Sequence, residues 1–143
     1  MYENYTRQSL PDREYRELLG TALCVFNSNN EFIIENIVST DLSCNWYDLI
    51  DKESGSLKQD IFDTITQSSG NSDIEKLFLD IVEERNRIVH SFQITSDKGE
   101  QILATKTRVK DGNVQFKITK EYLMDFIKKN EELSDLLHDY RGH

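Results

Sequence analysis

The chain has 143 residues and a net charge of −9, with 17 basic and 26 acidic side chains. Its length favours one domain with a hydrophobic core, and its charge argues against a general nucleic-acid-binding protein. No apolar run approaches the roughly 18 residues that a membrane-spanning helix needs. Residues 1–4 lack the basic start and apolar stretch of a secretory signal. We therefore expect a cytoplasmic protein with no membrane contact.

A long first helix is predicted from about residue 12 to residue 38, after a loosely ordered segment, residues 1–10. Pro11 and Asp12 suit its first turn. Apolar side chains then keep a helical period: Leu19, Ala22, Leu23, Phe26, Ile33 and Ile37. The alternative is a helical hairpin that turns at residues 27–30. The unbroken spacing across those residues favours one helix.

Shorter helices are predicted next. A loop covers residues 40–45, one helix begins near Trp46, and another runs from about residue 57 to residue 67. Gly55 separates or kinks them. After a turn at residues 68–71, the next helix runs from Asp73 to about Ser91. Its start carries the pattern of a capping box, with Ser72 as the N-cap and Glu75 reaching back.

The apolar period changes from helical to alternating after this helix. Strands are predicted at residues 93–95, 102–109 and 114–118, with turns at 96–99 and 110–113. Thr119 then caps a last helix. The predicted fold is mainly α: a helical bundle in a single domain, residues 1–143, with a small antiparallel β-insert, residues 93–118, before the last helix.

The β-insert is the basic part of an acidic chain. Residues 93–120 carry a net charge of +3, which leaves −12 for the remainder. Lys106, Arg108 and Lys110 alternate along the predicted middle strand, so one side of the sheet would be basic. The commoner role of such a strand is a solvated edge protected by charge, and we favour it. The alternative is that these three residues bind the backbone of a polyanionic substrate.

Arg85 interrupts the apolar stripe of the predicted helix 73–91. The stripe consists of Ile74, Leu77, Phe78, Ile81, Val82, Ile88, Val89 and Phe92. Arg85 lies within about 20° of its centre, where a charge is costly unless it is paired or functional. A purely structural role, with Arg85 paired to a glutamate across a dimer seam, is one alternative. Asn30 occupies an apolar place in the first helix, so it either joins a buried polar cluster, with Arg85 as one candidate member, or marks a helix break.

His90 follows Arg85 by five residues. A histidine can transfer protons near neutral pH. The alternative is a structural role, because a positive charge near a helix C-terminus interacts favourably with the helix dipole. Asn86 and His90 share a flank of the helix because they are four residues apart. Arg85 and His90 are about 140° apart on an ideal helix. For both to serve one site, either the long arginine stem reaches round or a second element or protomer completes the site.

The segment Glu84–Ser91 resembles the signature of HEPN domains (higher eukaryotes and prokaryotes nucleotide-binding). That signature is an arginine, a polar residue, three to five further residues and a histidine, here Arg85, Asn86 and His90. The expected architecture, a small helical domain with the motif late in a long helix, is also similar to that of HEPN domains. The β-insert is not part of the minimal family pattern. Elsewhere in the chain the resemblance is one of architecture only.

The resemblance implies a metal-independent endoribonuclease without cofactor, because many HEPN domains have this activity. His90 would move a proton of the ribose hydroxyl, Arg85 would stabilise the transition state, and Asn86 would orient His90 or contact phosphate. No histidine, cysteine or carboxylate spacing indicates a metal site. A homodimer with a composite cleft, an RNA substrate, a toxin or phage-defence role and an antitoxin or other regulatory partner are further expectations. The alternative is a non-catalytic HEPN-like module that binds a nucleotide or a protein.

Overall fold

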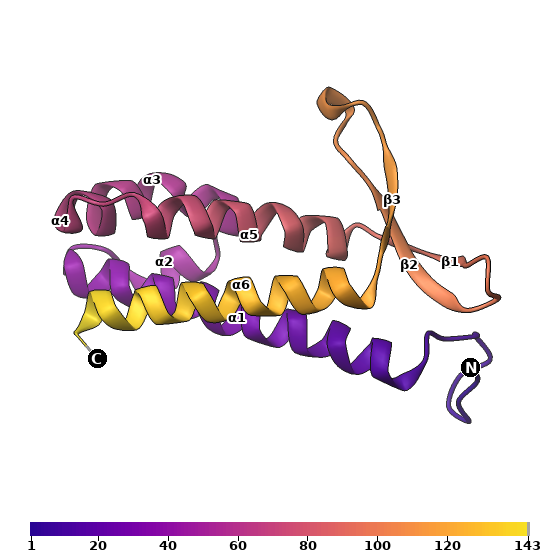
Figure 1. Cartoon of the computed structure of the whole chain (residues 1–143). Coiled ribbons are helices and arrows are strands. Elements are labelled where there is room, and N and C mark those ends of the chain that lie inside the picture. Colours follow the sequence, from indigo (N-terminus) through magenta and orange to yellow (C-terminus); the bar gives the residue numbers. More distant parts are fainter. Residues whose placement is uncertain (143) are drawn as a thin grey trace.

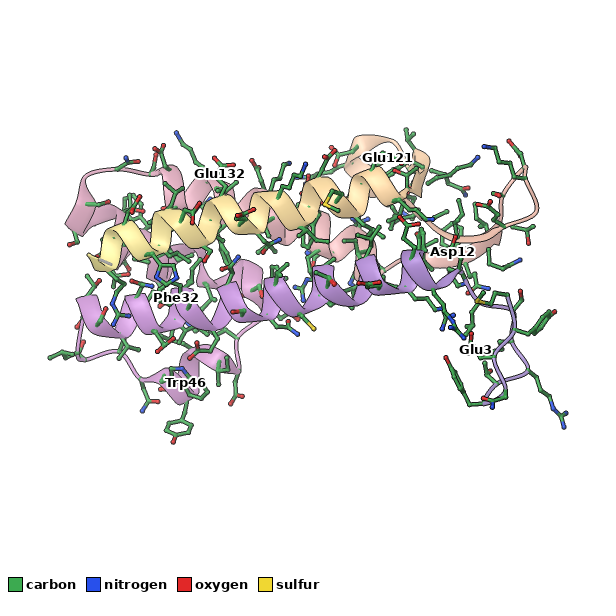
Figure 2. All side chains as sticks on the ribbon, turned by 60° about the horizontal axis from the view of Figure 1, so that its bottom comes forward. Glu3, Asp12, Phe32, Trp46, Glu121 and Glu132 are labelled. Atoms are coloured by element: carbon green, nitrogen blue, oxygen red, sulfur yellow. The ribbon has the colours of Figure 1, made fainter. Side chains whose placement is uncertain are left out.

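The two longest helices lie side by side along the molecule (Figures 1 and 2). They are α1 (Arg13–Thr40) and α6 (Lys120–Arg141) in this computed structural model, which describes residues 1–142. The Asp12 carboxylate accepts the backbone N–H of Tyr15 at 2.7 Å. The Thr119 hydroxyl accepts the backbone N–H of Tyr122 at 3.0 Å. These caps explain where both helices begin, and the unbroken α1 shows that the hairpin alternative is wrong.

Short helical pieces connect α1 to the next long helix. They are α2 (Trp46–Ile50), a 3₁₀ turn (Ser54–Leu57), α3 (Lys58–Ile61), a π-helical turn (Phe62–Thr66) and α4 (Gln67–Ser69). The last four pieces follow one another without a gap, so the helix expected at residues 57–67 is present with changing hydrogen-bond spacing. Gly55 lies in the 3₁₀ turn, and Gly70 ends the segment in the left-handed conformation at φ 68°.

The helix that carries the motif is α5 (Asp73–Val89), and it ends before the expected Ser91. The predicted capping box is wrong, because the Ser72 side chain forms no capping hydrogen bond. The Asn71 side-chain oxygen accepts the N–H of Asp73 at 2.7 Å instead. Glu75 accepts the hydroxyl of Thr66 at 3.1 Å, so its carboxylate joins α5 to the preceding turn.

The β-insert is a three-stranded antiparallel sheet in the order β1 (Phe92–Thr95), β2 (Gln101–Lys106), β3 (Gln115–Ile118). The middle strand is shorter than predicted. Beyond Lys106, the hydroxyl of Thr107 accepts the N–H of Val114 at 2.8 Å, and a 3₁₀ turn, Val109–Asp111, closes the connection. This β2–β3 connection points away from the helices (Figure 1).

An aromatic cluster forms the centre of the bundle. Phe26 of α1 stacks with Phe78 of α5 and with Phe126 of α6, each at a centroid distance of 6.4 Å. Burial of such large rings is a principal source of stability. Tyr15 attaches the sheet, because its hydroxyl donates to the carbonyl of Ile118 at 2.6 Å and accepts the N–H of Leu103 at 3.1 Å. Over residues 1–142, none of the helices combines the length and apolar character needed to cross a membrane.

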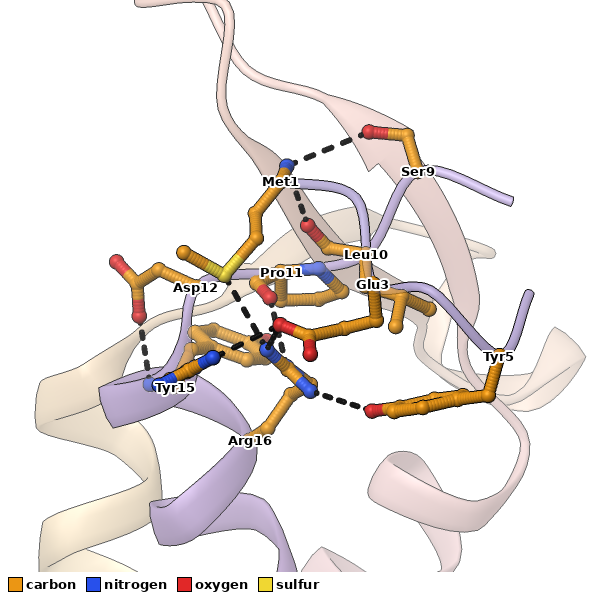
Figure 3. Close-up of polar contacts among 10 residues, drawn as sticks. Met1, Glu3, Tyr5, Ser9, Leu10, Pro11, Asp12, Tyr15 and Arg16 are labelled. Atoms are coloured by element: carbon orange, nitrogen blue, oxygen red, sulfur yellow. Dashed lines mark hydrogen bonds and ion pairs between the residues drawn. The ribbon is translucent and has the colours of Figure 1, made fainter. Parts of the chain in front are cut away.

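The N-terminal segment forms no helix or strand in residues 1–10, but hydrogen bonds hold it (Figure 3). The Met1 carbonyl accepts the N–H of Leu10 at 2.8 Å. The guanidinium of Arg16 donates to the Tyr5 hydroxyl and to Glu3, both at 3.1 Å. The segment is therefore an irregular loop that Arg16 attaches to the start of α1.

Candidate functional site

Arg85, Asn86 and His90 lie on the wall of one open pocket of about 540 Å³. Helix α5 supplies Arg85 and Asn86, and His90 follows directly as its C-cap. The opposite wall comes from α1, through Asn27 and Asn30, and from residues 52–56, which lead into and form the 3₁₀ turn before α3. The pocket therefore joins three segments that are far apart in the sequence.

Arg85 is the half-buried cation of this pocket. Its guanidinium carbon lies 4.7 Å from the centroid of the Phe26 ring, a cation–π contact worth roughly 0.5 to 2 kcal/mol. The Nε of Arg85 is buried and has no hydrogen-bond partner among residues 1–142. Burial lowers the pKa of Arg85 from its ordinary value, and the negative charge of Glu53 opposes this shift. The guanidinium remains charged, because arginine is not deprotonated in proteins.

His90 lies at the point where α5 ends. Its backbone N–H donates to the carbonyl of Asn86 at 2.9 Å, and its φ and ψ of −95° and 32° depart from the helical values. The side chain is exposed and forms no hydrogen bond or ion pair within residues 1–142. Both ring nitrogens are therefore accessible for proton transfer.

The angular separation of Arg85 and His90 is overcome within one chain. The long stem of Arg85 extends over Phe26, while His90 leaves the helix as its C-cap, and both side chains line the same pocket. A second protomer is thus not required to bring these two groups to one cavity.

Asn30 does not break α1, and the Ser54 hydroxyl donates to its side-chain oxygen at 2.8 Å. Asn30 lines the pocket with Arg85, but the described residues show no hydrogen bond between them. Sequence reasoning missed Glu53 and Ser54. Neither belongs to a motif, and only the folding of residues 52–56 against α1 and α5 places them here.

The three basic residues proposed as substrate contacts lie outside this pocket. Lys106 ends β2 and donates to the side-chain oxygen of Asn113 at 2.7 Å. Arg108 lies 3.7 Å from Glu83 of α5 and 3.5 Å from Asp111. Lys110 is exposed in the 3₁₀ turn. The predicted alternation is wrong, because β2 ends at Lys106 and the next residues turn.

The pocket combines a cation that can bind an oxyanion with an imidazole that can transfer protons. Glu53 adds one carboxylate, and Asn27, Asn30 and Asn86 add carboxamides. Among residues 1–142, no group of three or more histidine, cysteine or acidic side chains is placed to hold a metal ion.

Comparisons with protein-family models, curated proteins and solved structures found no match to this chain. Membership of the HEPN family therefore stays a prediction from the motif at residues 85–90 and from the helical architecture.

Proposed function

We propose that this protein is a metal-independent endoribonuclease of the HEPN type. The observation that carries the proposal is that Arg85 and His90 line one open pocket, with Asn86 between them. Neither the imidazole of His90 nor the guanidinium of Arg85 forms a hydrogen bond or ion pair within residues 1–142, so both groups are available to a ligand.

RNA supplies its own nucleophile in this reaction. The ribose 2′-hydroxyl attacks the adjacent phosphorus, His90 takes the hydroxyl proton, and the bond to the 5′ oxygen of the next nucleotide breaks as that oxygen gains a proton. The products are a 2′,3′-cyclic phosphate and a 5′-hydroxyl end. Arg85 binds the phosphoryl oxygens as negative charge builds up on them. Asn86 orients His90 or contacts the same phosphate.

A homodimer with a composite cleft is part of the proposal. Val89 and Phe92 lie on either side of the short His90–Ser91 link and are 52% and 43% exposed. Exposed apolar side chains beside a site favour a protein contact. A second copy packed there would bring a second His90 close to the cleft, and that histidine could protonate the leaving 5′ oxygen. A toxin or phage-defence role would suit such an enzyme, as would control by an antitoxin or other partner.

The second candidate is a non-catalytic HEPN-like module that binds a nucleotide or a partner protein. The net charge of −9 favours it, because an acidic surface repels a polyanion. Glu53 also brings negative charge to the pocket itself. Expression in cells separates the two candidates: a toxic wild type with harmless Arg85→Ala and His90→Ala variants supports the enzyme.

The direct test is cleavage of single-stranded RNA by the purified protein in the presence of EDTA. His90→Ala should lower the cleavage rate by about 10² to 10⁴. The folding of this variant should be unchanged, because His90 is exposed. A substrate with a single 2′-deoxynucleotide at the cleavage site should resist cleavage, because it lacks the nucleophile.

Arg7→Ala is the control for the loss of a positive charge in Arg85→Ala, since Arg7 is exposed and its side chain forms no hydrogen bond or ion pair within residues 1–142. It should cleave RNA like the wild type. Equal cleavage by the wild type and His90→Ala would overturn the proposed chemistry, as would a requirement for a divalent metal ion.

A further inference from the structure

The asparagines of α1 fall into two groups that differ in their partners. On the side that faces α6, the Asn29 amide donates to the carbonyl of Asn130 at 2.7 Å and to its side-chain oxygen at 3.0 Å. Nearer the C-terminal end of α1, the Asn36 amide donates to the carbonyl of Phe32 at 2.8 Å. These buried asparagines are tied to the protein itself.

The pocket asparagines are not tied in this way. Asn27 is exposed, lines the pocket and forms no side-chain hydrogen bond within residues 1–142. Asn30 accepts one hydrogen bond from Ser54, and its amide nitrogen has no partner there. Both lie on the wall that faces Arg85 and His90. Polar groups that converge on a concave site give a ligand its orientation.

We infer that this wall binds a nucleobase of the RNA, next to the phosphate held by Arg85. The inference rests on the proposed function, which makes RNA the ligand. A carboxamide has an acceptor beside a donor and matches the paired groups on a base edge. Bases of single-stranded RNA are recognised in this way. The volume of about 540 Å³ exceeds what a phosphate alone would fill and falls within the range of ligand pockets.

Glu53 makes the wall selective when Asn27 holds the edge of the base in place. Glu53 lines the same pocket, and its carboxylate only accepts hydrogen bonds when ionised. Adenine, cytosine and guanine each carry an exocyclic amino group that can donate to it. Uracil has two carbonyl oxygens beside a single N–H and would place an acceptor against the carboxylate. The site therefore disfavours uracil.

Binding of the four nucleoside monophosphates to the ¹⁵N-labelled protein tests this inference without cleavage. The wild type should bind UMP at least about fivefold more weakly than the best of AMP, CMP and GMP. Asn27→Ala should reduce this ratio below about twofold. Inorganic phosphate carries no base, so its affinity should be the same in Asn27→Ala and wild type.

Ser28→Ala is the matched control, because Ser28 is exposed, neighbours Asn27 on α1 and lines a different groove. Alanine favours a helix at both positions, so both variants should fold. Equal affinity of the wild type for all four nucleotides would overturn the inference. An unchanged ratio in Asn27→Ala, or an equal loss in Ser28→Ala, would also overturn it.

Cleavage of an RNA with a randomised segment separates this inference from the proposed function. Sequencing of the wild-type products should show uracil depleted at one position beside the cut, and Asn27→Ala should abolish the depletion. Cleavage without such a bias would overturn the proposed nucleobase site and would leave the proposed nuclease activity supported. Selective nucleotide binding without any cleavage would overturn the proposed nuclease activity and would leave the proposed nucleobase site supported.

Discussion

The two sides of α5 carry arginines with opposite surroundings. Arg87 donates to the carbonyl of Lys106 at 2.6 Å and lies 3.5 Å from Glu83, so it fastens the end of β2 to the helix. Arg85, two residues earlier, lies on Phe26 beside an open pocket, and its guanidinium forms no hydrogen bond or ion pair within residues 1–142. The difference shows that position on the helix, rather than residue type, decides which arginine is available to a ligand.

The largest expected effect is on cleavage. Arg85→Leu should lower the rate of RNA cleavage by about 10² to 10³, the usual cost of losing a group that stabilises an oxyanion. Arg87→Leu should leave the rate within about threefold of wild type, because Arg87 does not line the pocket. Single-turnover cleavage of one RNA by both variants gives the comparison. Equal losses in the two variants would show that the two sides of α5 do not differ in function.

The next effect is on stability, and the order of the two arginines reverses. Arg87→Leu should lower the free energy of unfolding by about 1 to 2 kcal/mol, because the Lys106 carbonyl loses a charged donor. Arg85→Leu should change it by less than about 1 kcal/mol, because the lost contact with Phe26 and the removal of a buried Nε without a partner oppose each other. Urea unfolding at pH 7 measures both. A larger loss for Arg85→Leu would indicate a structural role for Arg85.

The sequence distinguishes these two arginines because only Arg85 interrupts the apolar stripe. Helical periods that persist over many residues also predict α1, α5 and α6, since each must bury one face. Competition from side chains is harder to predict. Glu75 accepts a hydrogen bond from Thr66 instead of capping α5, and the N–H of Val114 donates to the Thr107 hydroxyl instead of to a backbone carbonyl. The second wall of the pocket is not predictable, because tertiary packing alone brings Glu53 to Arg85.

The smallest effect concerns Tyr122, which packs near Glu84 and away from the pocket. Its hydroxyl donates to the Glu84 carbonyl at 3.5 Å, and burial together with the Glu84 charge raises the pKa of Tyr122 to about 12 from 10.0. As the pH rises, the Tyr122 hydroxyl therefore loses its proton in the unfolded chain before it does so in the folded protein. The contribution of this group to the free energy of unfolding is complete below pH 10 and is lost as the pH rises toward 12.

Tyr122→Phe removes this proton and leaves the other tyrosines in place. At pH 7 the variant should match the wild type, because the 3.5 Å hydrogen bond is weak. From pH 10 to 12 the stability of the wild type should fall more steeply than that of the variant. The difference should stay below about 1 kcal/mol at pH 11, because solvent screens a half-buried group. Parallel stability curves from urea unfolding would contradict the burial of this hydroxyl. A change in RNA cleavage at pH 7 would show that the side of α5 opposite Arg85 also influences the pocket.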